Sequence, residues 1–349
     1  MPWPGTGSTA FSAELRLRAA LLTGWLAGLA LIAGMVGYWG AGEIGAALAM
    51  AGAGVLAVLP LHLGVLLADT CGWRAFLPRA QRAPLGSLLP FRWIASSVNG
   101  LLPVAQVGGE LVRTRLLHRS GIPGATAGAS VVVDLTVGLG MQVLFVGLGL
   151  ALLLAEQGGR AGLAEVSLGV LLLSVLLGIF LLAQREGLFL RLARLLERVS
   201  GGRRWLRLAG GAAALDREIL ASYRRGRRLL AGAGFRLFGW LWGSVEIWVA
   251  FWILGHPIGI AEAVILESVA QAVRSAGFAI PGGLGVQEGG LVLAGLWLGL
   301  PPELTLAMAL LKRARELIYG LPGLLAWTLF EGRTPARGLG GSRRAVPEI

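Results

Sequence analysis

The feature that most constrains this chain is a series of long apolar stretches, each about 20 residues or more. They do not alternate as half-buried strands do, and they lack the narrow apolar stripe of a soluble amphipathic helix. A helix of about 20 apolar residues crosses the roughly 30 Å hydrocarbon core of a bilayer. We therefore expect an all-α polytopic membrane protein with about six full transmembrane helices. The six expected spans cover residues 19–39, 44–68, 125–154, 163–183, 231–254 and a last apolar stretch that ends near residue 330.

The composition supports this class. Of 349 residues, 55% are hydrophobic and only 14% are charged, whereas an ordinary soluble domain has about 25% charged residues. The chain also contains 55 glycines. Glycine weakens soluble helices, but it lets membrane helices approach one another closely. This composition disfavours both a soluble globular protein and a disordered chain.

Several kinds of chemistry are excluded by residue counts. Every basic residue is arginine except Lys312, which does not lie in the Gly-x-x-x-x-Gly-Lys-Ser/Thr loop that holds a nucleotide triphosphate. The single cysteine, Cys71, excludes an internal disulfide and a cysteine-based metal cluster, and the three histidines are far apart in sequence. We therefore expect no cofactor and no metal, and we do not expect an enzyme.

Arginine distribution predicts the orientation. Residues 184–230 contain a dense series of arginines, and basic loops mark the cytoplasmic side of a membrane. Arginines also follow the last span and precede the first, so both termini are expected in the cytoplasm. Residues 69–92, which include Arg92, are likewise expected to be a cytoplasmic loop. The predicted organisation is a cytoplasmic segment 1–18, a first membrane half 19–183, the arginine-rich connection 184–230, a second membrane half 231–330 and a cytoplasmic tail 331–349.

Two further segments are too interrupted by proline and glycine for plain spans. They lie near 86–119 and 260–299, and they match each other at a constant offset of 178 residues. By loop counting, the first enters from the cytoplasm and the second from the outside. We expect two re-entrant helical hairpins related as an inverted repeat. The matched residues are Pro103 and Pro281, Glu110 and Glu288, Gly121 and Gly299, and Pro123 and Pro301.

Polar residues gather at the two bends and in the neighbouring spans. Irregular backbone within a membrane is tolerated where it is buried in protein or lines a wet cavity, and ionisable groups at that depth usually face an interior. We expect a polar cavity organised by Glu110 and Glu288, with basic side chains that contact phosphate or hydroxyl groups. The candidate cavity residues are Asn99, Pro103, Gln106, Gly108, Gly109, Glu110, Arg113, Asp134, Arg274, Pro281, Gly282, Gly283, Gly285, Gln287, Glu288 and Lys312.

Simpler interpretations of these charges stay open. Arg113 is three residues from Glu110 and can pair with it, and the cluster from Lys312 to Glu316 can neutralise itself within the last span. The basic residues at 113–119 can equally be cytoplasmic anchors.

The arginine-rich connection also has an apolar repeat with helical spacing, which begins at Leu188. Such an amphipathic stretch is expected to lie on the anionic inner leaflet. Nucleic-acid binding would require similar charge, but no motif supports it. Tryptophans near span ends, including Trp73 and Trp252, are expected to be interfacial anchors.

Two sequence segments resemble a known family. SSVNGLLPVAQVGGELVRTRLL and SAGFAIPGGLGVQEGG are similar to the lysylphosphatidylglycerol synthase transmembrane (flippase-like) family, and they look most like its hopanoid-biosynthesis-associated branch. The resemblance covers about 15–330 and implies a bacterial inner-membrane protein that acts on lipid headgroups. In bifunctional members this region moves the aminoacylated lipid between leaflets, and a large soluble C-terminal domain attaches the amino acid. Only about 19 residues follow the last span here, so we expect synthase activity to be absent.

Three functions follow as hypotheses. The first is a lipid translocase or lipid-transport accessory protein, with phospholipid or hopanoid as the lipid. The second is a membrane enzyme that transfers a group to a lipid headgroup, with Glu110 and Glu288 as general bases. The third is a scaffold that recruits lipid-synthesis enzymes through the arginine-rich connection.

Overall fold

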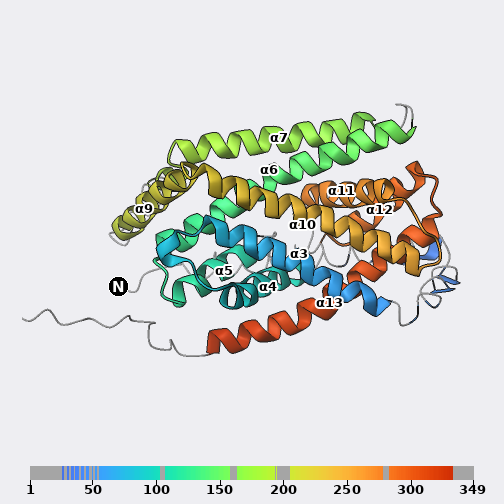
Figure 1. The fold of residues 1–349 in the computed structure, drawn as a ribbon, viewed down its shortest axis with the longest axis horizontal. Coiled ribbons are helices and arrows are strands. Elements are labelled where there is room, and N and C mark those ends of the chain that lie inside the picture. Colours follow the sequence, from blue (N-terminus) through green and yellow to red (C-terminus); the bar gives the residue numbers. More distant parts are fainter. Residues whose placement is uncertain are drawn as a thin grey trace, which may run out of the picture.

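A computed structural model describes residues 55–102, 107–157, 163–192, 194, 205–277 and 283–332, together with isolated residues between 26 and 52. These residues are helical apart from short turns, and no strand occurs among them. The expected all-α fold is confirmed (Figure 1). The helices are α3 (Val55–Phe76), α4 (Leu85–Leu101), α5 (Gly108–Arg119), α6 (Gly124–Gln157), α7 (Leu163–Arg185), α9 (Trp205–Tyr223), α10 (Gly226–Ile253), α11 (Ile260–Ala276), α12 (Val286–Trp297) and α13 (Pro302–Gly332), with a short 3-10 turn at Arg79–Gln81.

The helices fall into two length classes. Helices α3, α6, α7, α10 and α13 have 22 to 34 residues, enough to cross a bilayer. Helices α4 and α11 have 17 residues, and α5 and α12 have 12. Within the described ranges, α3 from Leu56 and α6 up to Glu156 are both long and apolar enough to span on composition alone. The expected span at 19–39 lies mostly outside the described residues.

The 178-residue offset recurs in the helix boundaries. Helix α5 begins at 108 and ends at 119, and α12 begins at 286 and ends at 297. Helices α6 and α13 begin at 124 and 302. The turns between them agree as well, because Gly121 and Gly299 both have positive φ, at 100° and 72°, where glycine avoids a steric penalty. Helices α3 to α6 are therefore repeated as α10 to α13.

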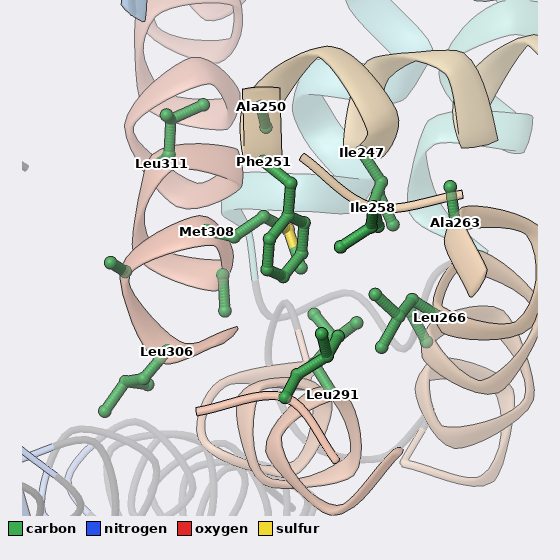
Figure 2. Packing of buried hydrophobic residues seen from close by; sticks show 14 of the residues in the cluster. Ile247, Ala250, Phe251, Ile258, Ala263, Leu266, Leu291, Leu306, Met308 and Leu311 are labelled. Carbon is green, nitrogen blue, oxygen red and sulfur yellow. The ribbon is translucent and has the colours of Figure 1, made fainter. Parts of the chain in front are cut away.

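The two repeats also build matching apolar cores. One core lies between α10, α11, α12 and α13 and includes Phe251 and Leu266, whose packing is shown in Figure 2. The other includes Trp73 and Leu88 of the first repeat, which are the residues 178 positions earlier. Each core packs the two long helices of one repeat against the short helical hairpin between them.

Equivalent helices of the two repeats run antiparallel. Along the α3–α10 contact, Leu61 lies against Trp242, Asp69 against Arg236 and Leu77 against Arg228. The numbers rise along α3 as they fall along α10, and Figure 1 shows the two helices side by side with opposite directions. A two-fold axis that relates antiparallel helices lies perpendicular to them. This is the geometry of an inverted repeat.

The repeats exchange contacts across this axis. Helix α4 packs on α13 of the other repeat, and α11 packs on α6. Small residues permit both contacts: a Cβ atom added at Gly323 would lie 2.0 Å from Oγ of Ser97, and one added at Gly149 would lie 1.8 Å from Oγ of Ser268. Glycine is therefore required where the two halves of the protein meet.

The arginine-rich connection is only partly described. Its helix α9 packs against α6 and contributes Ile219 to a buried cluster with Phe76 and Val133. The carboxylate of Asp216 accepts hydrogen bonds from the backbone amides of Phe189 and Leu190. Much of the predicted amphipathic stretch after Leu188 lies outside the described residues.

Polar and apolar side chains are distributed as in a membrane protein. Large apolar side chains such as Leu148, Ile179 and Leu325 are exposed, whereas Asp134 and Arg113 are fully buried. Trp73 corrects one expectation, because it is fully buried rather than interfacial. Trp252 is 67% exposed at the end of α10, where an anchor is expected.

Candidate functional site

The buried charges form two networks, one centred on each repeat. We name the first the N-half network. It contains three carboxylates and three arginines from helices α3, α4, α5, α6 and α10, and its members are Asp69, Arg92, Glu110, Arg113, Asp134 and Arg236.

Asp134 is the centre of the N-half network. Its Oδ2 accepts hydrogen bonds from Arg92 Nη1 at 2.9 Å, Arg113 Nη1 at 2.7 Å and Arg236 Nη2 at 2.8 Å. Arg236 Nε also donates to Oδ1 at 3.0 Å. One carboxylate on α6 therefore joins three helices. An uncompensated charge at this depth would be strongly unfavourable, so the network must stay paired.

Two more carboxylates balance the remaining positive charge of the three arginines in the N-half network. Asp69 accepts a hydrogen bond from Arg92 at 2.6 Å and one from Arg236 at 2.8 Å. Glu110 pairs with Arg113, as the simpler interpretation of their spacing predicted. The guanidinium of Arg113 also lies 4.5 Å from the ring centroid of Trp73, a cation–π geometry.

The first bend is held to this network through Asn99. Its Oδ1 accepts a hydrogen bond from the backbone amide of Gly109 at 2.8 Å, and its Nδ2 donates to Glu110 at 3.4 Å. A Cβ atom at Gly109 would lie 2.1 Å from the carbonyl oxygen of Ala95. The close approach of α5 to α4 therefore requires glycine at this position.

The second group is the C-half network. It contains four carboxylates and four basic side chains from helices α10, α11, α12 and α13. Its members are Glu246, Glu267, Arg274, Glu288, Lys312, Arg313, Arg315 and Glu316.

The C-half network has no single shared carboxylate at its centre but a series of linked pairs, and Arg315 also lies 3.9 Å from Glu316. Lys312 pairs with Glu267, and Arg315 pairs with Glu246. His62 of α3 lies 3.7 Å from the other oxygen of Glu246. These pairs lie inside the protein, between α13 and the helices α10 and α11.

A third part of the C-half network reaches the second bend. Glu316 accepts hydrogen bonds from Arg274 at 2.8 Å and Arg313 at 2.6 Å, and Arg313 also pairs with Glu288. The second oxygen of Glu288 accepts a hydrogen bond from the amide of Gly285 at 2.7 Å, which caps α12. Gly285 has φ of 78°, so glycine suits this turn.

Each network has a buried centre and a partly exposed edge. In the N-half network Asp134 and Arg113 are 0% exposed and Asp69 is 20% exposed. In the C-half network Glu288 is 2% exposed, whereas Arg274 is 21% and Glu316 15% exposed. Equivalent positions of the repeat also carry opposite charge, since Asp134 on α6 corresponds to Lys312 on α13.

Most predicted site residues that the structure describes are in or beside the networks. Asn99, Gly109, Glu110, Arg113 and Asp134 belong to the first group, and Gly108 begins the same helix α5. Arg274, Gly285, Glu288 and Lys312 belong to the second group. Gln287 lies 3.4 Å from Arg313, and Gly283 lies beside Arg274. Pro103, Gln106, Pro281 and Gly282 lie outside the described residues.

Sequence reasoning missed part of the N-half network. Asp69 and Arg236 were not proposed for the site, and Arg92 was assigned to a cytoplasmic loop although it is buried in α4. The sequence does contain one feature that could have identified two of these residues, because Asp69 and Arg236 are charged residues within largely apolar stretches. Because the partners are 23 to 167 residues apart, sequence spacing does not identify the pairs. Among the described residues, no group of three or more His, Cys, Asp or Glu side chains is suited to hold a metal ion.

Exposed apolar helices around buried charge networks, with antiparallel repeats, define a helical integral membrane protein. The chain matches the family described as "Lysylphosphatidylglycerol synthase TM region" over residues 25–323, and it belongs to that family. The family places it among membrane proteins of lipid-related processes. No curated protein and no solved structure matches the chain.

Proposed function

We propose that this protein is a lipid translocase, or an accessory protein of lipid transport, in a bacterial inner membrane. The observation that supports this most is the pair of charge-balanced networks at equivalent positions of an antiparallel repeat, each tied to a short helical hairpin. Many transporters place substrate sites at such a repeat interface, beside interrupted helices.

In this proposal the hairpins are re-entrant and open to opposite sides. Helices α4, α5, α11 and α12 have at most 17 residues, fewer than the roughly 20 that cross a bilayer. The arginine-rich connection places the α4–α5 hairpin on the cytoplasmic side and α11–α12 on the outside. Both termini then lie in the cytoplasm.

The headgroup would bind by exchanging ion-pair partners at the accessible edge. Arg274 and Arg313 both donate to Glu316, and guanidinium groups bind phosphate as well as carboxylate, often with two hydrogen bonds. A lipid phosphate replaces Glu316 on one arginine, while the freed carboxylate binds an amine or hydroxyl of the headgroup. A headgroup that carries both a phosphate and an amine adds no net charge, so for such a lipid the exchange is feasible within a membrane.

Each network has a partly exposed edge, at Asp69 in the N-half network and at Arg274 and Glu316 in the C-half network. Rocking of one repeat against the other would bring the headgroup from one edge to the other and so to the opposite leaflet.

The enzyme alternative receives less support. Every carboxylate of both networks is paired with an arginine or lysine, including Glu110 and Glu288, and a paired carboxylate is a poor general base. The lipid is a phospholipid or a hopanoid. The arginine-rich connection would bind the anionic inner leaflet and would be the natural contact for lipid-synthesis enzymes.

Reconstituted vesicles test the proposal. Purified protein should move headgroup-labelled phospholipid or hopanoid between leaflets faster than protein-free vesicles, and Arg313→Gln should reduce the rate. Arg191→Gln is the matched control, because it removes the same charge from an exposed pair with Glu186. Transfer no faster than in protein-free vesicles for every lipid would contradict the proposal. Formation of a modified lipid by protein supplied with a donor would favour the enzyme.

A further inference from the structure

Four arginines lie together at the end of the molecule where α3 stops and α10 begins. Arg79 and Arg82 come from the α3–α4 turn, and Arg225 and Arg228 come from the start of α10. The guanidinium of Arg228 is within electrostatic range of the other three. Two hydrogen bonds hold these side chains at the end of α3. Arg228 donates to the carbonyl of Leu77 at 3.3 Å, and Arg82 donates to the carbonyl of Ala75 at 3.5 Å.

This cluster, unlike the two networks, is not neutralised. No carboxylate among the described residues forms an ion pair with any of the four arginines. Nη1 of Arg225 and Nε of Arg82 are buried without a hydrogen-bond partner. The carbonyls at the end of α3 offset only about half a charge. An excess of positive charge therefore remains, and it would be stabilised by an anion with several acceptor oxygens.

The repeat shows that the fold itself does not require these arginines. The turn equivalent to α3–α4 is α10–α11, and it contains no arginine or lysine between Leu254 and Gly259. The equivalent helices of the second repeat are therefore joined, by a shorter connection, without basic residues.

An apolar hollow adjoins the cluster. It is lined by Ala231, Gly234, Phe235 and Phe238 of α10 and is open to the surface. Arg228 lies three residues before Ala231, and positions three or four apart in a helix share one face. The positive cluster and the apolar hollow are therefore adjacent along α10. This order matches a lipid, in which a charged headgroup is joined to an apolar acyl chain.

We propose that this site binds one anionic lipid of the cytoplasmic leaflet, with its phosphate on the four arginines and an acyl chain in the α10 hollow. The site is separate from both ion networks. The proposal does not depend on lipid transport, but its cytoplasmic side rests on the orientation proposed above. A soluble phosphate would contact only the arginines and would leave the hollow empty. Because a lipid would fill both the arginine cluster and the hollow, we assign the phosphate to a lipid.

The test uses the full chain purified in an uncharged detergent, with binding measured for short-chain phosphatidylglycerol, short-chain phosphatidylcholine and inorganic phosphate. The variant R79Q/R225Q removes two arginines whose side chains form no hydrogen bond with any residue that the structure describes. At roughly a fivefold effect for each basic residue near the surface, we expect phosphatidylglycerol to bind about thirty-fold more weakly. The control R191Q/R217Q removes the same charge from exposed positions of the 184–230 connection and should change binding less than about twofold.

A second variant addresses the hollow. A Cβ atom at Gly234 meets no atom within 4 Å, so Gly234→Leu should fold and fill the hollow. It should weaken phosphatidylglycerol binding and leave any phosphate binding unchanged. Equal lipid affinity in wild type and R79Q/R225Q, or an equal loss in the control, would overturn the site. Binding of inorganic phosphate without preference for phosphatidylglycerol over phosphatidylcholine would overturn the lipid assignment.

Discussion

The two ion networks occupy equivalent places in a repeated structure, yet they are built differently. In the N-half network three arginines converge on Asp134, and two of them also bind Asp69. In the C-half network Lys312, at the equivalent position, binds Glu267, and the remaining charges form further pairs that extend to a partly exposed edge. Both are charge-balanced within the protein.

This difference separates a structural role from a dynamic one. Removing Asp134 from the N-half network takes a shared acceptor from three buried arginines at once and leaves the network with one excess positive charge. A pair at the edge of the C-half network can open while its neighbours stay paired, because Arg313 and Glu316 each have a second partner. The N-half network is therefore expected to stabilise the fold, and the C-half edge is expected to exchange partners with a headgroup.

The largest expected effect is that of Asp134→Asn. Breaking a buried ion pair by removing one partner costs about 3–5 kcal/mol, and here three arginines lose their shared acceptor. The free energy of unfolding of the purified protein should fall by that amount. Glu186→Gln, in an exposed pair, is the control and should cost about 1 kcal/mol or less. Equal effects of the two substitutions would show that the N-half network is not structural.

The second largest effect is expected at the glycines where the two repeats contact each other. Gly149→Ala places a methyl group against Ser268, and Gly323→Ala places one against Ser97. Overpacking of this kind costs about 1–3 kcal/mol, and both variants should be destabilised because each contact packs a helix of one repeat closely against a helix of the other. Gly147→Ala is the matched control, since its Cβ atom meets nothing within 4 Å. An effect no larger than that of the control would contradict close packing at that contact.

Glu288→Gln should change transport more than stability. The amide oxygen of glutamine can still accept the hydrogen bond from Gly285, and Arg313 keeps its pair with Glu316. We expect headgroup transfer in vesicles to fall about tenfold, equivalent to about 1.4 kcal/mol, with a small change in unfolding temperature. The equivalent Glu110→Gln should instead lower the unfolding temperature, because Arg113 is fully buried and its remaining acceptor, Asp134, is already shared with Arg92 and Arg236. The reverse pattern would assign the roles to the opposite networks.

The smallest effect is expected for Arg191→Gln. Its pair with Glu186 is more than half exposed, at 63% and 64%, and an exposed pair contributes about 0–1 kcal/mol. Unfolding and lipid transfer should both stay close to wild type. A substantial loss of transfer would show that charge on the arginine-rich connection, rather than a particular network, controls transport.

The sequence predicts the repeat well because proline, glycine and glutamate act locally. The offset that relates Glu110 to Glu288 also relates the ends of α5 and α12. Long apolar runs likewise predict the spans, although the predicted span at 44–68 differs from α3, which continues to Phe76. These features depend on turn geometry and hydropathy, which short segments of sequence contain.

The sequence does not predict the partners of the charges. Arg92 looked like a loop arginine, because the rule that basic residues mark cytoplasmic loops does not distinguish a loop from a short re-entrant helix. Arg236 reaches Asp69 and Asp134 only because α10 crosses α3 and α6. Such pairing depends on tertiary packing. The hopanoid branch likewise stays a prediction, since the family match does not address it.

The inverted relation of the two halves is the central claim, and cysteine accessibility tests it most directly. Ser120 and Leu298 follow the two hairpins at equivalent positions, and each would be replaced by cysteine in a Cys71→Ala background. A membrane-impermeant thiol reagent applied to sealed vesicles of both orientations should label position 120 from the cytoplasmic side and position 298 from the outside. Labelling of both positions from the same side would contradict the inverted repeat and the transport proposal that depends on it.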